Sequence, residues 1–137
     1  MTAVSDPTAR PFSDSNDSLL RFAMRVDATV TGLCGLAVAF VADPLSSLTG
    51  LTSLQEYWLG AFFVLYGLVV FSLAALPNLR RAGIGVVAAN VLYTLAATVA
   101  AEAVPMTAMG VAATLVSGVY TAAFAGLQYL GVRRLHA

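Results

Sequence analysis

The chain has 137 residues, of which 59% are hydrophobic and 10% are charged, and its formal net charge is zero. A soluble domain carries about 25% charged residues, so this composition excludes an ordinary soluble domain. We expect the lipid bilayer to be its environment and no nucleic acid to be among its partners.

Four stretches of the chain are long and apolar enough to cross a bilayer as helices. Three of them are charge-free runs, Tyr57–Leu79, Ala82–Ala101 and Ala103–Val132. The first stretch, Leu19–Ala42, is weaker because it carries three charged residues near its start: Arg21, Arg25 and Asp27. The sequence therefore predicts an all-α, polytopic membrane protein, a four-transmembrane-helix bundle over residues 19–134, with spans at about 19–42, 55–76, 82–102 and 106–131.

The residues before the first span are rich in Ser, Thr, Asp and Pro and poor in apolar side chains. We expect residues 1–18 to form a disordered cytoplasmic tail, and residues 135–137 to form a short cytoplasmic end. An alternative is a signal peptide cleaved near Ala37–Ala39. Cleavage would leave three spans and would break the arginine pattern described next.

Every basic residue is an arginine, and every arginine lies beyond or at the span ends on one side of the predicted bundle: Arg10, Arg21, Arg25, Arg80, Arg81, Arg133 and Arg134. The two connections on the other side contain Asp43, Glu56 and Glu102 and no basic residue. This bias follows the positive-inside rule. It predicts a multi-pass protein of the cell membrane with both termini cytoplasmic (N-in/C-in). Six of the arginines are predicted to act as topology and headgroup anchors: Arg21, Arg25, Arg80, Arg81, Arg133 and Arg134.

Residues of the first span separate into faces at 100° per residue. Asp27, Thr31 and Cys34 share one face. A stripe of small residues lies beside them, and small residues allow helices to approach closely in a bilayer. The stripe consists of Ala28, Gly32, Gly35 and Ala39.

Asn90 in the third span lies at a depth similar to that of Asp27, about 13 Å against about 9 Å from the arginine end at 1.5 Å per residue. A carboxamide can donate two hydrogen bonds to a carboxylate. We therefore predict that Asp27 pairs with Asn90, with Tyr93 beside them and Gln128 in the same layer. Asp27, Asn90, Tyr93 and Gln128 form the candidate intramembrane polar site.

The connection after the first span contains Asp43-Pro44, which should end that helix, and a leucine-spaced segment that suggests a short surface helix. Ser53 and Glu56 have the spacing of a capping box for the second span. This span is rich in aromatic residues: Phe62, Phe63, Tyr66 and Phe71. Their rings either contact lipid and fill space around smaller helices or, alternatively, form an aromatic ligand cage. Glu56 and Glu102 are expected to be solvated helix ends.

The fourth span carries small residues at strict intervals of four: Gly110, Thr114, Gly118, Ala122 and Gly126. Such a ridge favours close helix packing, either within the chain or against a second copy or another membrane protein.

The strings LLRFAMRVDATVTGLCGLA, AANVLY and FAGLQYLGVRR resemble a group of small, uncharacterised four-helix integral membrane proteins of actinobacterial type. The resemblance would cover most of residues 19–134. It implies architecture only, because the group supplies no settled activity.

No phosphate loop, metal-ligand cluster or nucleophile–base pairing is present in the sequence. We therefore expect no enzyme, no catalytic residue, no metal and no cofactor. Two functions remain. The first is an interaction or accessory membrane component that acts through small-residue helix packing. The second is a small transporter or ligand carrier that uses the Asp27/Asn90 polar site.

Overall fold

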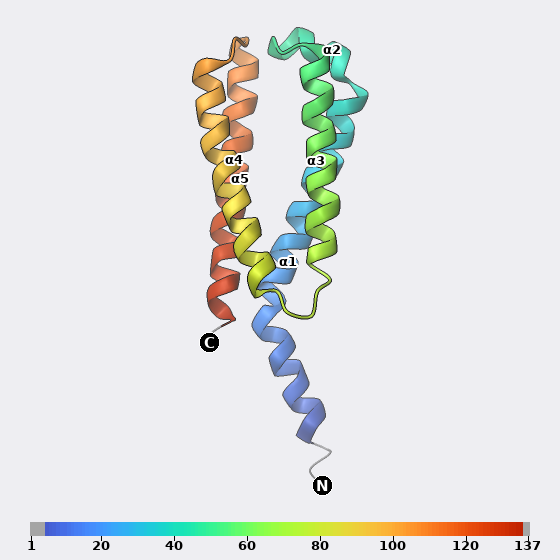
Figure 1. Ribbon diagram of the computed structural model, residues 1–137, viewed down its shortest axis with the longest axis vertical. Coiled ribbons are helices and arrows are strands. Elements are labelled where there is room, and N and C mark those ends of the chain that lie inside the picture. The colour runs from blue at the N-terminus through green and yellow to red at the C-terminus, as the bar shows by residue number, and fades with distance from the viewer. Residues whose placement is uncertain (1–4, 136–137) are drawn as a thin grey trace.

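The computed structural model describes residues 5–135, and these form five helices and no strand (Figure 1). The helices are α1 (Ser5–Phe40), α2 (Ala42–Thr49), α3 (Ser53–Leu73), α4 (Arg80–Ala103) and α5 (Ala108–Arg134). Four segments are long and apolar enough to cross a membrane: Asn16–Phe40 within α1, and the whole of α3, α4 and α5. The predicted all-α class and the four long apolar helices are confirmed.

The four long helices form two pairs (Figure 1). α1 packs along α3, and α4 packs along α5. The pairs meet mainly through α1 and α5, while in residues 5–135 α3 and α4 do not pack along each other. The short helix α2 lies across the end of the bundle opposite the chain termini, where it contacts α3 and α5.

The first helix is longer than the sequence predicts. α1 begins at Ser5, whereas residues 1–18 were expected to be disordered. Asp17 accepts a 2.8 Å ion pair from Arg21, four residues later in the same helix. Such a pair stabilises a helix that includes both residues. Residues 1–4 of the expected tail and residues 136–137 of the expected cytoplasmic end lie outside the described residues.

The break between α1 and α2 comes from proline. Pro44 has no N–H to donate to the carbonyl of Phe40, and α1 ends at that residue. Pro44 instead lies in the first turn of α2, where the missing donor costs little. α2 ends at Thr49 and is followed by Gly50, whose φ of 83° is in the left-handed region that favours glycine.

The capping box of α3 lies one residue earlier than predicted. Thr52 is the N-cap, and its hydroxyl accepts from the Gln55 N–H at 3.0 Å while the Gln55 side chain accepts from the Thr52 N–H at 2.9 Å. The prediction that Ser53 and Glu56 form the box is wrong, because Thr52 and Gln55 have the same spacing and satisfy both donors. Glu56 is thereby left to face inward.

The small-residue stripe of α1 packs against glycines of α3. A Cβ atom added to Gly67 would lie 2.6 Å from the carbonyl oxygen of Ala28 and 2.9 Å from the Cα of Gly32. A Cβ on Gly60 would similarly lie 2.6 Å from the carbonyl oxygen of Gly35. The two backbones are therefore in direct contact, which only glycine permits at these positions.

The ridge of α5 does not form one continuous packing face. Gly110 and Gly118 are buried and Thr114 is half-buried, but Ala122 and Gly126 are exposed. Steps of four residues rotate about 40° each around a helix of 3.6 residues per turn, so the ridge winds from the inside of the bundle to its outside. A Cβ added to Gly118 would lie 3.4 Å from the Ala97 side chain of α4, whereas a Cβ on Gly126 would meet nothing within 4 Å.

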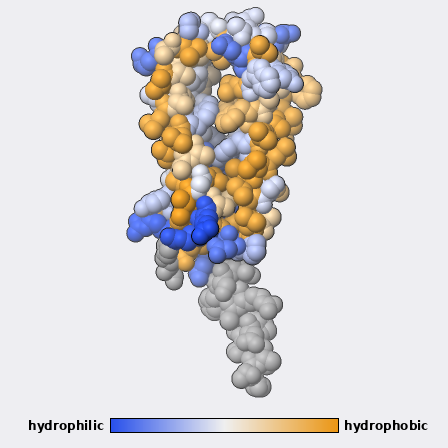
Figure 2. All heavy atoms as spheres, viewed as in Figure 1, coloured by the Kyte–Doolittle hydropathy of each residue, from blue (hydrophilic) through white to orange (hydrophobic). Residues whose placement is uncertain are grey.

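The apolar core lies near the end of the bundle that contains the α1 and α5 termini. Its buried residues come from all four long helices and the α3–α4 connection: Leu20, Met24, Ala28, Val70, Ala74, Leu79, Val86 and Val132. Figure 2 shows a mostly hydrophobic outer face along the helices, with hydrophilic residues gathered toward the two ends. The next layer along α1 beyond this core is polar.

Candidate functional site: a buried carboxylate beside a cavity

Asp27 is completely buried between the two helix pairs, one turn beyond Met24 on α1. It accepts hydrogen bonds from five side chains, of which one is on its own helix. The donors are Tyr66 at 2.8 Å, Gln128 at 2.9 Å and Asn90 at 3.1 Å to Oδ2, and Thr31 at 3.1 Å and Tyr120 at 3.2 Å to Oδ1. The carboxylate thus connects all four long helices.

The side-chain amide groups of Asn90 and Gln128 hold each other in place through a hydrogen bond. Asn90 donates one N–H to Asp27 and the other to the Gln128 Oε1 at 2.8 Å. Both side chains are buried, and no buried polar side-chain atom among the described residues lacks a partner. A network in which each member is satisfied is rigid and specifies one arrangement of the helices.

No cation is among the described residues that contact Asp27. A buried carboxylate normally has an ionic partner, and here uncharged hydrogen-bond donors take that place. The Tyr66 hydroxyl also lies 3.1 Å from the Asn90 Oδ1, so two acceptors are within its reach.

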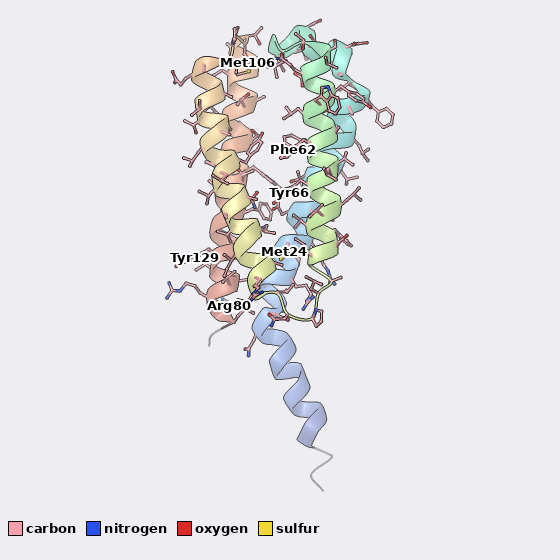
Figure 3. All side chains as sticks on the ribbon, in the orientation of Figure 1. Met24, Phe62, Tyr66, Arg80, Met106 and Tyr129 are labelled. Atoms are coloured by element: carbon pink, nitrogen blue, oxygen red, sulfur yellow. The ribbon has the colours of Figure 1, made fainter. Side chains whose placement is uncertain are left out.

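A cavity of about 350 Å³ lies directly beside this cluster. Four donors to Asp27 form one of its walls: Thr31, Tyr66, Asn90 and Tyr120. The remaining lining is mostly apolar and aromatic and includes Phe62, Phe63 and Tyr93. Figure 3 shows Phe62 and Tyr66 extending from α3 toward the space between the helix pairs. A concave, mainly apolar site with a few fixed polar groups is typical of small-molecule binding.

The other hydroxyl groups of the cavity wall are also hydrogen-bonded within the protein. Ser117 donates to the Thr114 carbonyl at 2.6 Å, and the Tyr93 hydroxyl lies 2.9 Å from the Ser117 oxygen. Thr121 donates to the Gly118 carbonyl at 3.0 Å. The wall is therefore built from internally satisfied groups on α4 and α5.

The structure brings together three of the four predicted site residues. Asp27, Asn90 and Gln128 are in direct contact, including the predicted Asp27–Asn90 pairing. Tyr93 is separate, because its hydroxyl bonds Ser117 deeper in the cavity rather than Asp27. It lines the same cavity as Asn90.

Sequence reasoning missed Tyr66 and Tyr120 as ligands of the carboxylate. Tyr120 lies about 12 Å along the helix axis from Gln128, so backbone depth gives no reason to group them. The length of the tyrosine side chain closes that distance. The only available signal was a hydroxyl-bearing aromatic in an apolar segment, which needs a hydrogen-bond partner when buried.

Three of the four aromatic residues weighed for a ligand cage line the cavity, namely Phe62, Phe63 and Tyr66. Phe71 does not line it, and Phe62 and Phe71 are both about half exposed. The Phe63 ring packs edge-on against Tyr93 of α4 at 5.8 Å between centroids. This contact spans the two helix pairs across the cavity.

The arginines predicted as anchors lie at the end of the bundle that contains the α1 and α5 termini, as Figure 3 shows for Arg80. Arg21 has a further contact, because it donates to the carbonyls of Ala74 at 2.5 Å and Leu76 at 3.0 Å, where α3 ends. A cation there satisfies carbonyls that lack helical partners. Arg25, Arg81, Arg133 and Arg134 have exposed side chains, and Arg133 lies over the Tyr129 ring.

The opposite end is closed by α2. Glu56 is 2% exposed and accepts from the Thr49 hydroxyl at 2.5 Å, so the expectation that it is a solvated helix end is wrong. The Thr107 N–H donates to the Thr49 carbonyl at 2.9 Å, which ties α2 to the start of α5. Glu102, in contrast, is exposed. These contacts close the bundle beyond the cavity.

No group of His, Cys, Asp and Glu suited to a metal ion occurs within the described part of the chain. No protein-family model, curated protein or solved structure matches the chain. The resemblance to actinobacterial membrane proteins stays a prediction. Function must therefore be argued from the cavity and the Asp27 cluster.

Proposed function

We propose that this protein is a multi-pass protein of the cell membrane that binds a small lipophilic molecule in the cavity beside Asp27, as a carrier or transporter. The observation that carries the proposal is the cavity of about 350 Å³, whose surface is mainly apolar and aromatic and which lies beside the hydrogen-bonded Asp27 cluster. Its volume lies within the range of small-molecule sites, about 300–1,000 Å³.

The orientation we propose has both termini in the cytoplasm. α1 and α4 start at the same end of the bundle, and α5 ends there (Figure 1). The six arginines named as anchors are at this end, which supports N-in/C-in by the positive-inside rule. The Asp27 cluster then lies nearer the cytoplasmic side than the outer side.

We propose further that the ligand enters from the bilayer between α3 and α4. These helices do not pack along each other in residues 5–135, and both contribute to the cavity lining. A lipophilic molecule dissolved in the bilayer could reach the cavity there without crossing water.

The alternative function, partner binding through small-residue ridges, receives less support. The stripe on α1 is used against α3, and Gly110 and Gly118 are buried within the chain. Only Ala122 and Gly126 of the α5 ridge remain exposed for a second copy or another membrane protein.

Cys34 provides a direct test, because it is the only cysteine and lines the cavity. The protein is reconstituted in liposomes, and alkylation of Cys34 by N-ethylmaleimide is followed by intact-protein mass spectrometry. We expect 2-phenylethylamine or 2-phenylethanol to slow the labelling saturably. Val116→Cys in a Cys34→Ala background gives a second reporter in the cavity lining.

The matched control is Leu33→Cys in the Cys34→Ala background. Leu33 neighbours Cys34 and is exposed like Cys34 and Val116, but unlike them it does not line the cavity. Labelling at this position should not respond to the compounds. Equal slowing at Leu33→Cys and at Cys34 would indicate a bilayer effect and contradict the proposal, as would the absence of protection at both cavity reporters.

A further inference from the structure

The surface of the cavity is almost wholly apolar, although several of the surrounding side chains carry hydroxyl or amide groups. The hydroxyl groups of Thr31, Tyr66 and Tyr120 are hydrogen-bonded to the Asp27 carboxyl group at 3.1, 2.8 and 3.2 Å. Asp27 itself does not line the cavity. The polar atoms of these three side chains are therefore directed to the cluster behind the wall, and a ligand meets their carbon atoms.

The remaining polar groups around the cavity are also paired within the protein. Asn90 donates its two side-chain N–H groups to Asp27 and Gln128. The other hydroxyl groups are hydrogen-bonded to backbone carbonyls of α5 or to each other: Tyr93, Ser117 and Thr121. No buried side-chain nitrogen or oxygen atom lacks a partner in the part of the chain that the structure describes. A polar group of a ligand would therefore enter the cavity without a hydrogen-bond partner.

The cavity lies halfway along the long helices. Its lining residues on α1 and α4 lie nine to thirteen positions after Arg21 and Arg80, which is about 14–20 Å along the helix axis. On α3, which runs in the opposite direction, they lie at the same distance from its first residue, Ser53. The hydrocarbon core of a bilayer is about 30 Å thick, so the cavity is centred near its middle. A charged or unpaired polar group is least stable at that depth.

The size of the cavity favours a compact molecule. An apolar cavity of about 150 Å³ is large enough for benzene, so about 350 Å³ accommodates a ring with a short side chain. On α1, α3 and α4 the lining extends over about 6 Å of the helix axis, whereas an extended lipid acyl chain crosses a leaflet whose hydrocarbon layer is about 15 Å thick. A small molecule therefore matches the cavity better than a whole lipid tail does.

From these observations we infer that the cavity binds small, uncharged hydrocarbons of about the size of an alkylbenzene, without any hydrogen-bonding group. The bilayer is as apolar as the cavity, so the hydrophobic effect does not drive the ligand from one to the other. Affinity comes from dispersion contacts with carbon atoms of the wall, including those of Val30, Phe62 and Phe63. The inference rests on the proposed function and specifies its ligand class.

Four phenyl compounds of similar size test the absence of a polar partner. They are n-propylbenzene (no polar group), 2-phenylethanol (a neutral hydroxyl), 2-phenylethylamine (a cation) and phenylacetate (an anion). Each is titrated against Cys34 labelling in liposomes, and its dissociation constant is referred to the concentration dissolved in the bilayer. We expect n-propylbenzene to bind most tightly, the alcohol next and the two ions most weakly.

The expected differences follow from the hydrogen bonds that each compound gives up. In the bilayer the polar end of the alcohol lies among headgroups and water, and in the cavity it has no partner. We expect this loss to weaken binding at least tenfold relative to n-propylbenzene. The two ions lose more, because a charge near the bilayer centre costs more than a hydroxyl. The polar compounds still protect Cys34 at higher concentration, through their phenyl rings.

A pair of neighbouring substitutions shows whether the ligand occupies this cavity. Ala89 lines the cavity, whereas Ala88 does not, and both are exposed positions of α4. Ala89→Phe places a ring in the cavity and should weaken protection by n-propylbenzene at least tenfold. Ala88→Phe adds the same ring outside the cavity and should leave protection unchanged. Equal effects of the two variants would contradict binding in this cavity.

The outcomes distinguish the two proposals. If none of the four compounds protects Cys34 or Val116→Cys, small molecules do not displace lipid tails from the cavity, and the proposed function fails together with the inference. If the compounds protect but the alcohol or either ion binds as tightly as n-propylbenzene, ligand binding stands and the inference is overturned. The ranking in the wild-type protein decides this even if Ala89→Phe does not fold.

Discussion

The Asp27 cluster allows a quantitative prediction about stability. Two substitutions of Asp27 differ in how many of the surrounding hydrogen-bond donors they leave without an acceptor. Asp27→Leu removes every acceptor oxygen and retains an apolar side chain of comparable size. Five side-chain hydrogen bonds to the carboxylate are lost. Hydrogen bonds between helices in a bilayer contribute about 0.6 kcal/mol each on average, so the loss in the free energy of unfolding should be about 3 kcal/mol.

Asp27→Asn should be much less destabilising, because the new amide N–H₂ group can find hydrogen-bond acceptors in the cluster. If the new N–H₂ group took the position of Oδ2, it would face the N–H donors of Asn90 and Gln128. At the position of Oδ1 it faces the hydroxyls of Thr31 and Tyr120, which can turn and accept. The buried charge is also removed. We expect the free energy of unfolding to change by less than about 1 kcal/mol.

The assay is reversible unfolding in mixed micelles with an increasing mole fraction of sodium dodecyl sulfate. Near-ultraviolet circular dichroism reports on the fixed tyrosine rings of the cluster rather than on helix content, which the detergent preserves. An Asp27→Leu variant as stable as the wild type would refute the view that the carboxylate holds the four helices together. Equal destabilisation by Leu and Asn would show that the charge, and not the acceptor geometry, is what matters.

Three further outcomes are expected in the same unfolding assay. Gly67→Ala should lower the free energy of unfolding by about 1–3 kcal/mol, because the added Cβ would meet the α1 backbone. Gly85→Ala is the control: its Cβ would meet nothing within 4 Å, so it should be neutral or slightly stabilising. Equal effects of the two substitutions would contradict direct backbone contact between α1 and α3. Arg21→Ala should cost about 1–3 kcal/mol by freeing the carbonyls of Ala74 and Leu76, and no loss would mean that the arginine acts only as a topology anchor. Glu56→Gln should cost less than Glu56→Leu, because glutamine can still accept from Thr49; the reverse order would contradict the role of this contact in holding α2.

Much of the architecture could be predicted from the sequence because it depends on local properties of the chain. Runs of apolar residues fix the four long helices, and periodicity at 100° per residue places Asp27, Asn90 and Gln128 on inward faces. Depth along a helix is a simple multiple of the residue count, which is why the Asp27–Asn90 pairing could be foreseen. The glycine stripe on α1 follows from the same counting.

Other features depend on a choice between neighbouring residues that could fill the same structural role, and the sequence pattern does not show which residue is used. Thr52 and Ser53 both begin segments with capping-box spacing, and only the position of α2 decides that Glu56 turns inward to Thr49. The reach of a tyrosine side chain likewise depends on where its helix lies. Tyr66 and Tyr120 therefore enter the site only once the helices are placed.

The sequence by itself determined the helices, their apolar character and the inward-facing carboxylate of the first span, because these follow from residue type and helical period. Only the tertiary structure decided which helices pair, that the α5 ridge winds out of the bundle, and that α3 and α4 do not pack along each other in the described chain. The cavity exists for that last reason. The hydroxyl groups of Tyr66 and Tyr120 beside it are held by Asp27, an arrangement that no spacing in the sequence encodes.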